Sequence, residues 1–142
     1  LHSPLLSVHV MVIMFSYALF AMMMLVGIQG LICHRRRDYA RSESLAALSH
    51  LMLYPAVFLL TAGIFIGAVW ANVSWGRYWS WDPKEVWALI TMLIYMAPFH
   101  SSSIKCFRST KFFHFYCILA FLSVLITYFG VNFLLGGMHS YA

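Results

Sequence analysis

Four apolar stretches separated by short polar segments dominate the pattern of the chain. They run from about Val8 to Ile32, from about His50 to Ala71, from Val86 to Phe99 and from about Phe112 to Leu135. The third stretch is short. Only when it is extended to residues 83–100 does it approach the roughly 20 residues that a bilayer requires. The stretches lack the alternation of a membrane β-barrel strand, and backbone groups in lipid must bond internally. The pattern therefore predicts four transmembrane helices.

The composition agrees with an integral membrane protein. Of the 142 residues, 63% are hydrophobic and only 9% are charged, whereas a soluble globular domain carries about 25% charged residues. So few charges cannot cover a water-facing surface, which excludes a soluble enzyme and a disordered chain. We predict an all-α bundle of four transmembrane helices that forms a single domain over residues 1–142. Because the chain begins at Leu1 and lacks the basic region of a signal peptide, we expect it to be part of a longer protein.

The basic residues predict the orientation in the membrane. Seven of the nine Lys and Arg residues lie in two segments, 34–44 and 100–111. By the positive-inside rule, both segments face the cytoplasm or the plastid stroma. Both termini and the segment from Asn72 to Glu85 then face the outer compartment. The net charge of +5 comes largely from these short segments, so it indicates topology and not nucleic-acid binding.

All five tryptophans lie close together, between residues 70 and 87. They are Trp70, Trp75, Trp79, Trp81 and Trp87, with Tyr78 among them. An aromatic belt at the membrane interface is the plain alternative, but a belt distributes its rings over several helix ends. Rings gathered at one end favour a platform that holds a large, flat, apolar ligand by stacking and by burial of area.

The polar residues of this segment predict its local structure. Asp82 suits the N-cap of the third helix, Pro83 its first position and Glu85 its third, as in a capping box. Gly76 permits a tight turn and the close approach of a ligand. Arg77 and Lys84 can pair with acidic groups of a ligand, although a phospholipid head group would satisfy them equally well.

Two of the seven histidines can approach the tryptophan-rich segment from opposite sides. His9 begins the first helix and His139 follows the last, both on the predicted outer side. Two neutral imidazoles across a flat aromatic platform form the ligand set of a bis-histidine haem. Zinc is the competing metal, but no third or fourth ligand and no cysteine is evident on that side. A single histidine at a helix end more commonly lies at the membrane–water interface without binding a ligand.

The segment WGRYWSWDPKEVWALIT resembles the WWD motif of the CcsA/ResC family of cytochrome c assembly proteins. The resemblance extends on both sides of the motif. Residues 7–10 look like the first external histidine of the family at a helix start, and residues 67–72 look like the usual approach to the motif. Phe99–His100 matches the membrane-embedded histidine, and residues 128–132 leading to 138–141 resemble the second external histidine. The similarity covers nearly the whole chain.

The resemblance implies cytochrome c biogenesis in a multi-pass membrane protein, either in a bacterial plasma membrane or, alternatively, in a plastid thylakoid. Haem b would rest on the external WWD platform with His9 and His139 as axial ligands, and would be presented for thioether attachment to the CxxCH motif of apocytochrome c. His100 would ligate haem at a second, intramembrane site. A membrane component of the CcsB/ResB type would complete the cytochrome c synthetase. The platform residues would be Trp75, Gly76, Arg77, Trp79, Trp81 and Asp82.

Three alternatives remain open from the sequence. A haem exporter or chaperone would show nearly the same features without attaching haem. A b-type electron-transfer subunit would ligate haem between two helices within the membrane and would not need the tryptophan-rich segment. A structural membrane subunit would leave the order of the motifs as coincidence. His34, His50 and His114 do not fall on family histidine positions, and we expect them in the core or at the interface.

Overall fold

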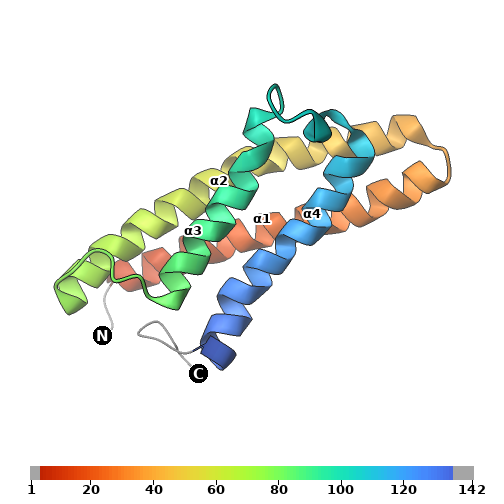
Figure 1. Cartoon of the computed structure of the whole chain (residues 1–142). Helices are drawn as coiled ribbons and strands as arrows, with labels where there is room; N and C mark the ends of the chain where they lie inside the picture. The colour runs from red at the N-terminus through yellow and green to blue at the C-terminus, as the bar shows by residue number, and fades with distance from the viewer. Residues whose placement is uncertain (1–3, 136–142) are drawn as a thin grey trace.

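The computed structural model describes residues 4–135, and within that range every regular element is a helix (Figure 1). The main helices are α1 (Pro4–Arg35), α2 (Tyr39–Trp75), α3 (Pro83–Met96) and α4 (Thr110–Leu125). Two short 3-10 helices, η1 (Ala97–His100) and η2 (Lys105–Arg108), connect α3 to α4, and the π-helix η3 (Ile126–Leu135) continues α4. The predicted all-α fold is confirmed.

Three of the four predicted spans are long enough to cross a bilayer. The remaining one, which is third along the chain, is shorter. The long, apolar helices are α1, α2 and the continuous helix Thr110–Gly130. Helix α3 has 14 residues, a length of about 21 Å against a hydrocarbon core of roughly 30 Å. Pro98 cannot donate to the Ile94 carbonyl, as an α-helix would require. That carbonyl instead accepts from the Ala97 N–H and from the Tyr116 hydroxyl, and the chain tightens into η1.

The helices alternate in direction, which separates the connecting segments into two groups (Figure 1). Residues 76–82, the start of α1 and the end of η3 lie at one end of the molecule. The turn between α1 and α2 and the connection through η1 and η2 lie at the other end, where the two basic segments are. The two groups of segments that the basic residues assigned to opposite sides are therefore at opposite ends.

Helices α1 and α2 extend well beyond their apolar stretches. The basic segment 34–44 between them lies outside the apolar stretches, yet it is mostly helical, and only residues 36–38 form the turn. Arg37 adopts a left-handed conformation with φ of 62°, and the Asp38 carboxylate accepts from the Arg41 N–H at 3.4 Å to cap α2. The Arg, Ala, Ser and Glu residues of this segment are compatible with a helix that is exposed to water. The hydrophobic pattern therefore gave the extent of the apolar stretch and not the end of the helix.

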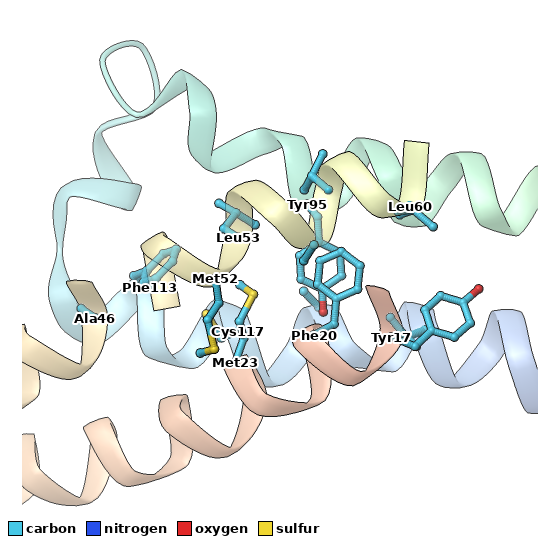
Figure 2. Packing of buried hydrophobic residues seen from close by; sticks show 14 of the residues in the cluster. Tyr17, Phe20, Met23, Ala46, Met52, Leu53, Leu60, Tyr95, Phe113 and Cys117 are labelled. Carbon is cyan, nitrogen blue, oxygen red and sulfur yellow. The ribbon is translucent and has the colours of Figure 1, made fainter. Parts of the chain in front are cut away.

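Small polar side chains hold α1 against α2. The Ser16 hydroxyl donates to the Ala56 carbonyl at 2.7 Å, and the Ser42 hydroxyl donates to the Gly30 carbonyl at 3.1 Å. Such contacts suit helices in lipid, where packing and interhelical hydrogen bonds replace the hydrophobic driving force. Aromatic packing adds α3 to this pair, because the rings of Phe20 and Tyr95 stack with centroids 3.7 Å apart (Figure 2).

The hydrophobic core lies between the four helices (Figure 2). Its fully buried members include Phe20 and Met23 of α1, Leu53 and Leu60 of α2, Tyr95 of α3, and Phe113 and Cys117 of α4. Tyr17 of α1 lies at the edge of this core and is 9% exposed. It also contributes to the wall of a cavity, described next.

Candidate functional site

The tryptophan-rich segment begins with a glycine turn. Gly76 ends α2 with φ of 77°, in the left-handed region, and its N–H donates to the Asn72 carbonyl at 2.9 Å. Glycine adopts this conformation without the steric cost that a Cβ would bring. The tight turn predicted at Gly76 is therefore confirmed, and it directs the chain from α2 across the end of the bundle.

A capping box ends the segment and starts α3 as predicted. The Asp82 carboxylate accepts from the Lys84 N–H at 3.3 Å, and Glu85 Oε2 accepts from the backbone N–H groups of Asp82 and Ser80 at 3.2 and 2.8 Å. These bonds satisfy orphan donors at the helix start. Asp82 is buried, and its hydrogen bonds fix the end of the tryptophan-rich segment to the start of α3.

The tryptophans of this end divide into two edge-to-face pairs. Trp70 and Trp75 of α2 have ring centroids 4.8 Å apart, and Trp79 and Trp81 of the connecting segment have centroids 5.8 Å apart. Within the second pair the environments differ. Trp81 is 70% exposed and has a φ of 58°, which is strained for a residue other than glycine, whereas Trp79 is half-buried.

Trp79 borders a cavity of about 440 Å³. The cavity lies between α1, α2, the start of α3, the segment 78–79 and η3, and its wall is mostly apolar. This volume is within the range of small-molecule sites in proteins, roughly 300–1,000 Å³. The lining side chains that bear chemistry are His9, Tyr17, Tyr78, Trp79, Lys84, Glu85, Thr127 and Tyr128.

His9 is the potential metal ligand of this cavity. Its Nδ1 lies 2.7 Å from the carbonyl oxygen of Gly63 on α2. A carbonyl oxygen can only accept, so Nδ1 carries the proton, and in the neutral ring Nε2 then carries the lone pair. Metal-ligating histidines commonly have this arrangement, with the second nitrogen bonded to a backbone carbonyl.

The charged groups on the wall come from the start of α3. Lys84 Nζ lies 5.8 Å from the centroid of the Tyr128 ring, a cation–π distance. Glu85 is engaged by the capping box. Lys84 is therefore the cation at the cavity, whereas Arg77 is exposed and does not line it.

The structure brings some of the sequence-predicted site residues together and separates others. His9 and Trp79 share the cavity, while Trp75, Gly76, Arg77, Trp81 and Asp82 belong to the same end of the molecule without lining it. His100 is exposed in η1, at the opposite end. His139 lies outside the described residues.

The remaining described histidines pack within the protein, as expected. His114 is fully buried, and its Nε2 donates to the Ser42 carbonyl at 2.8 Å. His50 stacks on Phe113 with centroids 3.9 Å apart, and His34 packs edge-on against Tyr39 with centroids 5.0 Å apart.

Sequence reasoning missed the walls that α2 and η3 contribute. The contact of His9 with α2 could have been found from the sequence. His9 and Ile13 are four residues apart on α1 and face Gly67 and Gly63, which are four residues apart on α2. Such spacings mark close helix contacts in membranes. No sequence pattern indicated that Thr127 and Tyr128 line the cavity, because their position depends on the π-helical geometry of η3.

Comparison with known proteins gives a consistent result. The profile of the family described as cytochrome C assembly protein matches residues 1–139. The CcsA cytochrome c biogenesis protein of Pyropia yezoensis is 53% identical over 102 residues, which are 70% of this chain and 31% of that protein. The corresponding protein of Prochlorococcus marinus (strain AS9601) is 46% identical over 107 residues, 73% of this chain and 33% of that protein.

A third relative is longer still. The protein NrfI of Wolinella succinogenes is 38% identical over an alignment of 143 positions, which covers 96% of this chain but 16% of that protein. The chain thus spans a third or less of the length of the relatives it matches.

Proposed function

The chain belongs to the family of cytochrome c assembly proteins, and from this premise we propose that it binds haem b in the cavity beside His9 and presents it to an apocytochrome c. The observation that carries the proposal is the pairing of His9 with Trp79 on one cavity wall. A neutral histidine in the ligating tautomer and an aromatic ring meet there in a mostly apolar space. This combination suits haem, because its iron takes imidazole and its macrocycle is flat and apolar.

The remaining walls fit the rest of such a substrate. Lys84 supplies a cation for a carboxylate, and Tyr17, Tyr78 and Tyr128 add aromatic surface. His139 follows η3 by four residues in the sequence. We assign it the role of the second ligand of the haem iron, as the resemblance to the family implies. The exposed ring of Trp81 lies in the segment that an apocytochrome would approach.

The chain's own residues hold and orient the substrate in this proposal. His9 and His139 hold the iron, and Trp79 and the apolar wall hold the macrocycle. The reaction itself joins the two thiols of a CxxCH motif to the haem vinyl groups as thioethers. The histidine of that motif then takes the place of one axial ligand. We place this end of the molecule in the outer compartment, because the basic segments lie at the other end.

Two further parts of the proposal concern the whole protein. His100, exposed at the opposite end, would belong to a second haem site whose other ligand comes from a CcsB/ResB-type membrane component. The membrane would be a bacterial plasma membrane or a thylakoid membrane. With that component, the chain would form the haem-presenting part of a cytochrome c synthetase.

The test is the visible spectrum of the full-length protein purified from membranes. We expect the spectrum of reduced bis-histidine haem b, and we expect it to be lost or shifted in a His9→Ala, His139→Ala double variant. His34→Ala is the matched control, because His34 lies on the same helix at the other end. If the spectrum is unchanged in the double variant, the haem is bound at His100 and not at His9. Absence of haem from the wild type would overturn the proposal.

Attachment separates a synthetase from a haem exporter. The full-length protein is co-expressed with an apocytochrome c, and haem that resists extraction from the cytochrome is measured. We expect covalent haem with the wild type and with His34→Ala, and none with His9→Ala. Haem bound by the wild type without any covalent product would instead support export or chaperoning.

A further inference from the structure

The ring of His9 is held by two glycines of α2, one through its carbonyl and one through its missing side chain. The first contact is the 2.7 Å hydrogen bond from His9 Nδ1 to the Gly63 carbonyl oxygen. The carbonyl belongs to the rigid backbone of a long helix, so it defines the direction from which the Nδ1 proton is accepted. It therefore selects both the tautomer and the rotation of the ring.

The second contact is steric. A Cβ placed on Gly67 would lie 2.5 Å from Cε1, 2.8 Å from Nδ1 and 3.1 Å from Nε2 of His9. The imidazole thus lies directly on the backbone of α2, in space that any other residue would fill. One turn away, the side chain of Ile13 occupies the corresponding space over Gly63. The two contacts keep α1 and α2 in register along this part of the pair.

From this geometry we propose that Gly63 and Gly67 are the positioning residues for the haem ligand His9. Gly63 keeps the proton on Nδ1 so that Nε2 is the ligating atom, and Gly67 provides the seat that sets where Nε2 lies in the cavity. The inference rests on the proposed function, in which His9 ligates haem. It adds that the ligand is oriented before haem arrives, which reduces the cost of ordering it on binding.

The chain offers a matched control at its other end. The ring of His114 lies on Gly30 of α1 in the same way, and a Cβ on Gly30 would overlap that ring. His114 does not line the cavity. Gly30→Ala therefore introduces a lesion of the same kind, an added methyl group against a histidine ring between helices, without touching the proposed ligand. The overlap at Gly30 is the closer of the two, because a Cβ there would lie nearer to the ring than the 2.5 Å at Gly67.

The first measurement uses the haem-free, full-length protein labelled with 15N-histidine. At alkaline pH, where imidazole is neutral, NMR distinguishes the Nδ1–H tautomer from the Nε2–H tautomer. The signal of His9 is identified by its loss in His9→Ala. We expect the Nδ1–H tautomer in the wild type and in Gly30→Ala, and a mixture in Gly67→Ala. An Nε2–H tautomer in the wild type would overturn the proposal even if Gly67→Ala does not fold.

The second measurement is titration with ferric haem b. Loss of an outer contact of a metal-ligating histidine typically lowers metal affinity by about 10- to 100-fold, and we expect that loss for Gly67→Ala together with a change from a low-spin to a high-spin spectrum. Added free imidazole should restore the low-spin spectrum, because the cavity itself is intact. Gly30→Ala should keep the wild-type affinity and spectrum.

The two measurements separate failure of this inference from failure of the proposed function. Wild-type affinity and spectrum in Gly67→Ala would overturn the positioning role while leaving haem binding in place. A wild type that binds no haem would overturn the proposed function, and the tautomer of His9 would still decide whether the two glycines orient the ring.

Discussion

His9 and His114 are held by the same device at opposite ends of the molecule, and the comparison shows what turns a packing residue into a candidate ligand. Each ring lies on a glycine of a neighbouring helix, and each donates to a backbone carbonyl of α2, at 2.7 Å for His9 and 2.8 Å for His114. The difference is the nitrogen that donates. It is Nδ1 in His9 and Nε2 in His114.

That difference gives the two rings opposite tautomers. In His9, the proton on Nδ1 leaves the lone pair on Nε2 of a half-buried ring at a cavity wall. In His114, the remaining nitrogen Nδ1 is buried without a hydrogen-bond partner among the described residues. Burying a polar atom in this way costs free energy. His114 thus fills the core at a cost, whereas the ring of His9 lines the cavity.

The largest expected effect comes from removing each ring in turn. His9→Ala should abolish cytochrome c maturation and leave most of the fold intact, because the ring lines a cavity. His114→Ala should lower the free energy of unfolding by about 2–5 kcal/mol, as for other large buried side chains, and the folded fraction should still bind haem. Covalent haem in the cytochrome and denaturant unfolding in detergent measure the two effects. Equal loss of stability in both variants would contradict the distinction.

Two tryptophans of the tryptophan-rich end differ in their relation to the cavity. Trp79 lines the cavity, whereas Trp75 packs on Trp70 and does not line it. We expect Trp79→Ala to weaken haem binding about tenfold, or 1.4 kcal/mol, because stacking and buried area are lost. Trp75→Ala should change the affinity less than twofold. Similar losses in both variants would mean that the tryptophans act as one platform, as the sequence pattern alone suggests.

Much of this end could be predicted from the sequence because local rules govern it. The capping box at Asp82 and the turn at Gly76 depend on residues within a few positions of each other. The alternating basic segments gave the two ends of the bundle, since each helix reverses the direction of the chain. The resemblance to the WWD motif selected His9 and Trp79, which the structure places on one cavity.

The rest could not be predicted, because it depends on how helices far apart in the sequence meet. Trp79 and Trp81 are two positions apart, yet one borders the cavity and the other is exposed, since the left-handed conformation of Trp81 redirects the chain. The seat of His9 is on α2, more than fifty residues away. The apolar pattern also could not show that α1 and α2 continue as helices beyond their apolar stretches.

A smaller effect separates the frame of this end from its ligand groups. Asp82→Ala removes the N-cap of α3 and should cost about 1 kcal/mol of stability. Asp82 does not line the cavity. The haem affinity of the folded variant should therefore stay within twofold of that of the wild type. Asp82→Asn is the matched control, because asparagine caps nearly as well. Loss of haem binding in Asp82→Asn would give the carboxylate a direct role that the cap does not explain.

A still weaker effect is expected where hydroxyl groups join α3 to η3. The hydroxyl oxygens of Thr91 and Thr127 lie 3.0 Å apart, so one hydroxyl donates its proton to the other. The accepting hydroxyl donates to a carbonyl of its own helix, which is Trp87 at 2.8 Å for Thr91 or Ser123 at 2.7 Å for Thr127. Thr91→Val should cost about 0.6 kcal/mol, the average for an interhelical hydrogen bond in a membrane protein, and Thr91→Ser should restore it. Because Thr127 lines the cavity and Thr91 does not, unchanged haem affinity in Thr91→Val would show that packing here stabilises the wall without controlling it. A parallel fall in stability and affinity would show instead that the wall formed by η3 depends on this contact.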